Sequence, residues 1–362
     1  MSFFNRFSPQ TMLIATALAC ASAAGAQNLT PSCGGTEGPP AWLNTSTLQG
    51  NLGGRPIAMH LDPKTPYSFR YFYAAYGVDI ALLPFQQGDT LILQEVVLSD
   101  RQATKPTTGC FSLRQTPAGL TGEWTSKNKP SPLPVRLSTV NVATLPIIGR
   151  PSVGLEALRT DYPLDFLKLN RPWTASTRLQ EPYSGLTYPS VPQAAPGLRA
   201  AFQDRLVENV QIALECQTFS GMPRPYHLKT AITLATPRLL SIREDVRLNC
   251  VGLADAFTNG LILDRQTGQR LEISALWPEL DTEQQVALYK ATLSPAKLAL
   301  CPATLYTDAA LDVYLTPKGL ALTPDLSHRV PTACKQTAVI PYAQLRSKLN
   351  KASNYYADLA TR

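Results

Sequence analysis

Few residues in this chain have the types and the spacing of a known catalytic motif. The three histidines, His60, His227 and His328, are far apart in the sequence, and no H-E-x-x-H spacing occurs, which argues against a zinc hydrolase. A G-x-S-x-G nucleophile elbow is absent, and no C-x-x-C is present that would bind a metal through thiolates. The sequence therefore predicts neither a metal site nor a bound cofactor.

Two S-x-x-K tetrads occur, Ser126–Lys129 and Ser294–Lys297. This pattern is short, and neither K-T-G nor S-D-N accompanies it as in the serine acyltransferases that use it. The first tetrad falls in a polar loop. In the second, Pro295 follows the serine, so we expect a helix to begin there. We predict no nucleophile at either position.

Glu95 and Glu123 are the two carboxylates that could support glycoside cleavage. That chemistry needs them ~5 Å apart in a retaining enzyme or ~6.5–9.5 Å apart in an inverting one. Both residues fall in predicted strands, where solvated acids are common. A cell-wall glycan hydrolase is therefore the alternative interpretation, and a non-catalytic protein is the first.

Aromatic residues give the best candidates for ligand binding. Tyr67, Phe69, Tyr71 and Tyr73 alternate, so they fall on one face of a predicted strand. Such a face is usually core, but tyrosine and tryptophan also line binding grooves. The candidate ligand-binding residues are Tyr67, Tyr71, Tyr73 and Trp124.

The elements that would position these residues form an α+β protein of 362 residues, long enough for about two domains at ~150 residues each. Residues 27–140 contain short strands with frequent turns, which predict an antiparallel barrel or sandwich. Residues 141–187 are rich in proline and predict a linker with a short helix near Leu164–Leu169. Residues 188–362 predict a second domain with hairpins and two or three helices.

Within the second domain, Leu198, Phe202, Leu206 and Val210 form one helical stripe. Ile212 and Leu214 alternate and predict a strand that contains Cys216. Residues 261–277 predict a hairpin around the turn Asp264–Gly268. Asp281 and Gln284 predict a helix cap, residues 311–322 another hairpin, and residues 339–349 a last strand and a short helix.

The first 26 residues have the features of a secretory signal peptide. Arg6 precedes an apolar stretch from Met12 to Ala23, and Ala24-Gly25-Ala26 fits a small-residue cleavage site. A lipoprotein anchored through Cys20 is less favoured, because Ala17 stands where leucine is usual. Removal of this segment changes the formal net charge from +7 to +6. No basic run with interleaved aromatics predicts nucleic-acid binding, and no transmembrane helix is predicted in the mature chain.

Without Cys20, six of the seven cysteines remain. An even number in an exported chain predicts disulfide bonds, although the sequence leaves several connectivities open. We favour bonds between consecutive cysteines, because each would then lie within one structural unit. These pairs are Cys33–Cys110, Cys216–Cys250 and Cys301–Cys334.

Residues ~185–350 resemble the C-terminal domain of RsiV-type anti-sigma factors, which also accompanies the deacetylase module of PdaC-like peptidoglycan enzymes. The similar segments are Leu240–Ile242, Leu263–Gly268, Leu271–Trp277, Val313–Leu320 and Ile340–Leu345. The resemblance implies an exported protein that recognises another envelope macromolecule, which in RsiV-type proteins is lysozyme. The anti-sigma segment and the deacetylase histidines have no counterpart here, so neither transmembrane signalling nor deacetylation is implied.

Residues 48–137 also resemble a β-rich module of uncharacterised bacterial envelope proteins. The residues that carry this second resemblance are Gly50, Ile57, Tyr71, Tyr73, Glu95, Gly122 and Trp124. Together these observations predict a periplasmic or secreted, non-catalytic protein that binds a peptidoglycan fragment or a lysozyme-like protein. A structural partner of an envelope assembly is a further alternative.

Overall fold

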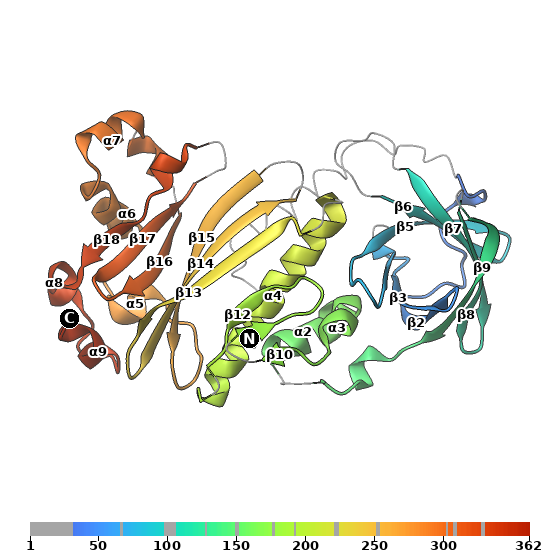
Figure 1. Cartoon of the computed structure of the whole chain (residues 1–362), viewed down its shortest axis with the longest axis horizontal. Coiled ribbons are helices and arrows are strands. Elements are labelled where there is room, and N and C mark those ends of the chain that lie inside the picture. The colour runs from blue at the N-terminus through green and yellow to red at the C-terminus, as the bar shows by residue number, and fades with distance from the viewer. Residues whose placement is uncertain are drawn as a thin grey trace.

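The computed structural model confirms an α+β fold with an antiparallel barrel in its N-terminal part. Figure 1 shows the barrel at one end of the molecule, β16–β18 with α6 and α7 at the other, and α4 beside β13–β15 between them. The structure describes residues 32–65, 68–97, 106–126, 129–148, 152–175, 178–191, 193–220, 224–250, 254–301, 303–306, 310–326 and 330–362.

Eight antiparallel strands close the barrel in the order β5-β4-β3-β2-β9-β8-β7-β6, because β6 pairs again with β5. They are β2 (Ser46–Leu52), β3 (Arg55–Leu61), β4 (Arg70–Tyr73), β5 (Ile80–Gln87), β6 (Thr90–Val96), β7 (Thr107–Thr116), β8 (Gly119–Ser126) and β9 (Lys129–Thr139). The short strand β1 (Thr36–Glu37) pairs with the end of β5. The β5–β6 pairing closes the sheet, so these eight strands form a barrel without a free edge strand.

Alternate side chains of these strands fill the barrel interior, as expected for eight strands. Leu48, Met59, Tyr71, Leu93 and Phe111 are each at most 1% exposed. The frequent turns predicted in this region are confirmed by the hairpins β5–β6 and β7–β8, in which Gln87 pairs with Thr90 and Thr116 with Gly119. The interior is therefore a packed hydrophobic core.

The described residues of 141–187, predicted as a linker, form helices and strands. They contain η2 (Val142–Thr144), α2 (Val153–Asp161), α3 (Pro163–Leu169), β10 (Thr174–Ala175) and β11 (Arg178–Gln180), and β12 (Thr187–Pro189) follows. The predicted helix near Leu164–Leu169 is α3. Pro163 is the first residue of α3. Proline has no backbone N–H, and at this position of a helix that N–H would have no partner within the helix, so its absence costs no hydrogen bond.

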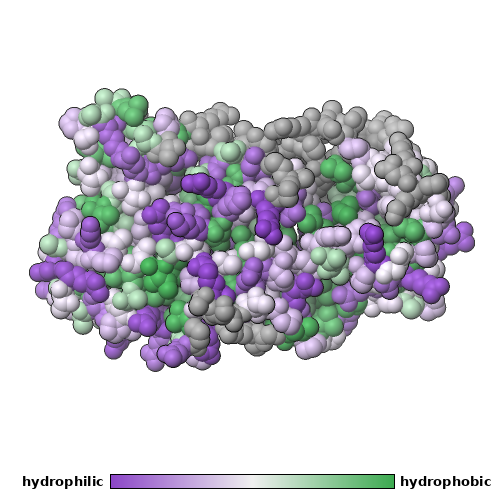
Figure 2. Space-filling view, viewed as in Figure 1, coloured by the Kyte–Doolittle hydropathy of each residue, from purple (hydrophilic) through white to green (hydrophobic). Residues whose placement is uncertain are grey.

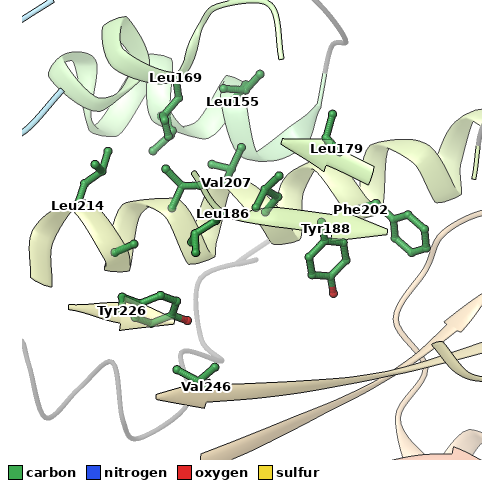
Figure 3. Packing of buried hydrophobic residues seen from close by; sticks show 14 of the residues in the cluster. Leu155, Leu169, Leu179, Leu186, Tyr188, Phe202, Val207, Leu214, Tyr226 and Val246 are labelled. Atoms are coloured by element: carbon green, nitrogen blue, oxygen red, sulfur yellow. The ribbon is translucent and has the colours of Figure 1, made fainter. Parts of the chain in front are cut away.

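The long helix α4 (Pro196–Ser220) is buried on two sides. Figure 3 shows α2 and β11 on one side of it and Tyr226 and Val246 on the other. The predicted stripe is confirmed, since Leu198, Phe202, Leu206 and Val210 are all buried. The strand predicted around Cys216 is wrong, because Ile212 and Leu214 continue the helix. Since this helix is buried on two sides, its apolar residues do not show the spacing of a helix with one buried side.

The three-stranded sheet β13 (Tyr226–Ala235), β14 (Leu239–Asn249) and β15 (Ala254–Asp264) packs one face on α4. Its other face meets β16 (Ala310–Thr316), where the amide of Leu315 donates to Ser241 Oγ at 2.8 Å. An added Cβ at Gly260 would lie 2.1 Å from the Val313 carbonyl oxygen, so this crossing needs a glycine.

The second core lies between β16, β17 (Gly319–Asp325), β18 (Ala338–Pro341) and the surrounding helices. These helices are α5 (Ile273–Leu276), α6 (Thr282–Ala291), α7 (Pro295–Leu300), η3 (Ala303–Tyr306), η4 (Thr332–Lys335), α8 (Tyr342–Leu345), η5 (Arg346–Lys348) and α9 (Tyr356–Ala360). The predicted cap is confirmed, because Asp281 accepts from the amide of Gln284 at 2.8 Å. Ser294 caps α7 in the same way.

The hairpin predicted for residues 261–277 is half right. The turn forms, and Asp264 Oδ1 accepts from the amides of Gln266 and Thr267. The return arm makes a single bridge, Leu263 with Arg270, and then enters α5. Trp277 is buried against Tyr342, so the apolar residues here pack into a core between helices and do not extend the sheet.

Lys168 joins the barrel to the rest of the molecule. Its side chain is 2% exposed, and its ammonium lies 2.7 Å from Asp79 Oδ1 and 2.8 Å from Asp165 Oδ1. Burial alone would lower the pKa of Lys168, but these two carboxylates outweigh it and the pKa is raised. Nearby, Tyr183 donates to the carbonyl of Ala74 at 2.7 Å. Polar contacts thus fix the barrel against α3.

Three disulfide bonds join Cys33 with Cys110, Cys216 with Cys250, and Cys301 with Cys334. They are the consecutive pairs favoured from the sequence. The last bond closes a separation of 33 residues, which contributes about 3–4 kcal/mol in the chain-entropy account. Among the described residues, no helix has both the length and the apolar composition that crossing a membrane requires.

Candidate functional site

Glu95 lies at one end of the barrel interior and accepts hydrogen bonds from three side chains. Its Oε2 accepts from the Tyr71 hydroxyl at 2.6 Å and from Trp124 Nε1 at 3.0 Å. Its Oε1 accepts from the Thr108 hydroxyl at 2.6 Å. Glu95 is 8% exposed, and no cation of the described residues forms an ion pair with it. We call Tyr71, Tyr73, Glu95, Thr108 and Trp124 the barrel-end cluster.

Strand alternation directs most of the barrel-end cluster inward. Tyr71 and Tyr73 follow Phe69 on the inner face of β4, and Glu95 follows Leu91 and Leu93 on β6. Trp124 occupies the corresponding place at the end of β8. An added Cβ at Gly109 would lie 2.4 Å from Trp124 Nε1, so a glycine on β7 makes room for the indole.

Two irregularities in the strand register lie at this end of the barrel. One separates Glu95 from Val96 and leaves Thr108 as an extra residue on β7, between Gly109 and Thr107. The other lies between Trp124 and Ser126 on β8. Bulges at a barrel rim redirect side chains. The first explains how the hydroxyl of Thr108 reaches the inward-facing carboxylate of Glu95.

Aromatic rings extend from the barrel-end cluster to the solvent. Tyr71 is fully buried and contacts Phe111 edge-on at 5.3 Å and Tyr73 at 5.6 Å between ring centroids. Tyr73 and Trp124 are partly buried, and Tyr76, 6.4 Å from Tyr73, is 63% exposed. The barrel end therefore offers apolar ring surface beside a fixed carboxylate.

The two tyrosines of the cluster remain protonated at neutral pH. Burial, followed by the Glu95 carboxylate, raises the pKa of Tyr71 far above its usual range. Burial also raises the pKa of Tyr73. Both phenols can thus donate hydrogen bonds, and Tyr71 donates its own to Glu95.

The structure brings together three of the four predicted ligand-binding residues, Tyr71, Tyr73 and Trp124. Tyr67 lies outside the described residues. Glu123 points to the outer face of β8 and is exposed, so it does not share a site with Glu95. Thr108 and Tyr76 were not predicted: a bulge leaves no pattern in the sequence, whereas the Tyr73–Tyr76 spacing beside Gly77 was a usable signal for an aromatic loop.

Within the described part of the chain, no three histidine, cysteine or acidic side chains gather as a metal site would require. His60 Nδ1 is 3.0 Å from the Thr47 hydroxyl, and burial, followed by the charge of Arg70, lowers its pKa. His328 lies outside the described residues, as do the two middle residues of the first S-x-x-K tetrad, Ser126–Lys129. In the second S-x-x-K tetrad, Lys297 Nζ bonds Gln336 and Ser294 caps α7, so the two do not form a catalytic dyad.

A second buried carboxylate, Glu244 on β14, is fully enclosed. It accepts from the Tyr188 hydroxyl at 2.6 Å and from Arg205 Nε and Nη2 at 2.9 and 2.6 Å. The Tyr226 hydroxyl donates to Asn209 Oδ1 at 2.6 Å nearby. These groups tie α4 to the β13–β15 sheet, and Glu244, with 0% exposure, offers nothing to a ligand.

Comparisons with known proteins give one structural neighbour to report. The chain matches no family model and no curated protein. A solved structure of a DUF3298 family member from Bacteroides fragilis NCTC 9343 is similar over 78% of this chain and 98% of that chain, with 14% identity and a TM-score of 0.33. DUF3298 is a domain of unknown function. The resemblance to RsiV-type domains stays a prediction.

Proposed function

We propose that this chain is a non-catalytic binding protein of the cell envelope and that the barrel-end cluster binds a glycan, such as a peptidoglycan fragment. The observation that carries the proposal is the arrangement around Glu95. One carboxylate is held by three donors at the end of an otherwise packed barrel, beside rings that become more exposed toward the solvent.

This arrangement suits a sugar. A pyranose presents apolar C–H faces that stack on aromatic rings and hydroxyl groups that donate to a carboxylate. Tyr73, Tyr76 and Trp124 would provide the rings, and Glu95 the acceptor. Because the donors already hold the carboxylate in place, little conformational entropy would be lost when a ligand binds.

A hydrolytic role for the same carboxylate receives less support. The predicted partner Glu123 lies on the other face of the barrel wall, and Glu95 is bonded to three side chains. Zymography on peptidoglycan tests this alternative. A zone of clearing that disappears in Glu95→Gln would overturn the non-catalytic part of the proposal.

Titration with soluble muropeptides, followed by tryptophan fluorescence and calorimetry, tests the binding proposal. We expect saturable binding, with the Kd raised at least tenfold in Glu95→Gln and in Trp124→Phe, about 1.4 kcal/mol. Glu123→Gln is the matched control on the opposite face and should bind as the parent does. Absence of saturable binding, or equal binding by all variants, would overturn the proposal.

A lysozyme-like protein is a second candidate partner, favoured by the RsiV-type resemblance of residues ~185–350. Its test is a pull-down with immobilised lysozyme, in which Glu95→Gln and Trp124→Phe should be retained as the parent is, because the barrel lies outside the similar segments. Failure of the full chain to be retained would discard this partner without affecting the glycan proposal.

A further inference from the structure

One face of the β13–β15 sheet carries positive side chains, of which Arg243 lies over the Tyr314 ring of β16 and His227, Lys229 and Arg247 are exposed. His227 and Lys229 on β13 point away from α4, as do Arg243, Asp245 and Arg247 on β14. His227 lies opposite Arg247, and Lys229 lies opposite Asp245. We call these five residues the basic sheet face. It adjoins the place where β16 crosses the sheet at Ser241 and Gly260. Figure 2 shows hydrophilic and hydrophobic side chains mixed over the part of the molecule where this sheet lies.

The charges of this face are poorly balanced. Asp245 bonds Arg243, with Nη2 at 2.7 Å and Nε at 2.8 Å, and also accepts from the Thr258 hydroxyl at 3.1 Å. Within the described residues, Lys229, His227 and Arg247 have no ion pair or hydrogen bond, and all three are exposed. Side chains directly opposite in a sheet have Cβ atoms about 4.5–5.5 Å apart, and diagonal ones about 7–8 Å.

Lys229 lies directly opposite Asp245, but that carboxylate also bonds Arg243, so the repulsion between Lys229 and the diagonal Arg247 is only partly offset. The sheet end is nevertheless rigid. The disulfide Cys216–Cys250 holds the end of β14 to α4, and the amide of Asn249 donates to the Pro225 carbonyl at 2.9 Å. A partner that bridges the cations would remove the repulsion without reordering the backbone.

The neighbouring surface limits the kind of partner. On β15 the same face presents the small residues Ala256 and Thr258, and beyond them Lys335 lies 3.6 Å from Asp255. None of the exposed large hydrophobic side chains of the described residues belongs to this face. It therefore lacks both the aromatic anchor of a protein interface and the apolar group that would enter a lipid layer.

We propose that the basic sheet face binds an acidic polysaccharide, whose anionic groups lie across Lys229 and Arg247. Charge complementarity over a flat, rigid surface is the basis of this second site. It is independent of the barrel-end cluster, which is proposed to bind a glycan through ring stacking and one carboxylate.

The test measures binding of dextran sulfate, with uncharged dextran as the reference, at physiological salt. We expect the double variant Lys229→Gln/Arg247→Gln to raise the Kd for dextran sulfate at least tenfold. The matched control Arg114→Gln/Arg136→Gln removes two exposed charges from the outer wall of the barrel, where they flank Thr121, and should change the Kd less than twofold. Uncharged dextran should not bind this face.

Three outcomes would overturn the proposal: no binding of dextran sulfate by the parent chain, the same loss in both double variants, or binding to anionic phosphatidylglycerol vesicles without binding to dextran sulfate. Because all four replaced side chains are exposed, a thermal melt should show each variant folded. Trp124→Phe separates the two proposals, since it should weaken muropeptide binding and leave dextran sulfate binding unchanged.

Discussion

Glu95 in the barrel and Glu244 in the β13–β15 sheet are both buried, and each accepts a hydrogen bond of 2.6 Å from a tyrosine hydroxyl. They differ in the remaining donors. Arg205 binds Glu244 through two nitrogens inside a closed core, whereas neutral groups hold Glu95 at the end of the barrel. The difference teaches that an arginine-paired acid serves the fold, whereas an acid held only by neutral donors at the barrel end is the one that we propose to contact a ligand.

The largest effect should follow from breaking the arginine pair. Arg205→Met leaves the Glu244 carboxylate buried without a cation, so we expect the free energy of unfolding to fall by about 3–5 kcal/mol. Urea denaturation measures this change. Glu208→Gln removes only the exposed partner of the same arginine and should cost less than about 0.5 kcal/mol. Equal losses in the two variants would contradict the comparison.

Asp312 is a third acid to compare with Glu95 and Glu244. It is half-buried and has no ion pair among the described residues. Burial, then the nearby Asp325, raises its pKa to about 7. A carboxyl whose pKa is higher in the folded than in the unfolded state lowers the stability of the fold as pH rises from about 4 to 7. Asp312→Asn should therefore stabilise the fold by about 2–4 kcal/mol at pH 8 and by much less at pH 4.

Urea midpoints of the parent chain and Asp312→Asn at the two pH values measure this difference. The amide side chain of the variant would keep an acceptor for the Gly260 amide, which bonds the carboxyl in the parent chain. An equal gain at both pH values would show that packing, and not ionisation, is responsible.

A smaller effect on stability is expected at Glu95. Glu95→Gln keeps one acceptor oxygen, and the hydroxyl groups of Thr108 and Tyr71 can turn toward it, so the free energy of unfolding should fall by only about 1 kcal/mol. Denaturation and muropeptide titration of the same sample separate the two roles. A loss as large as that of Arg205→Met would place Glu95 with the structural acids.

The smallest effect is expected for Glu123→Gln, within about 0.5 kcal/mol, because Glu123 is exposed on the outer wall. Thermal melting measures it. A change of more than about 1 kcal/mol would mean that the outer face of the barrel contributes more than its exposure indicates.

Patterns with a regular period were the predictable part of this molecule. Alternation located most barrel strands, and the caps at Asp281 and Ser294 and the turn at Asp264 follow from local hydrogen bonding. The wrong predictions lie where the spacing of apolar residues does not match the burial of a single face of a helix or strand. Residues 212–216 belong to a helix buried on two sides, and the residues after Gly268 pack as a helix against Tyr342.

The candidate site was predictable only in its aromatic part. Alternation places Tyr71 and Tyr73 on one face, but the pairing of β6 with β7 that brings Gly109 and Thr108 to Glu95 is a long-range fact of barrel closure. The bulge at Thr108 has no local signal. Glu95 and Glu123 could not be separated from spacing alone, because which face of a strand points inward depends on its register.

The order of the three disulfide bonds has a consequence for how the chain matures. The six bonded cysteines pair in the order of the sequence, the first with the second and so on, so each bond can close before the next bonded cysteine is synthesised. An oxidase that joins thiols in the order of their synthesis would therefore form the three native disulfide bonds without later isomerase-catalysed exchange. The order of synthesis would then determine which cysteines pair.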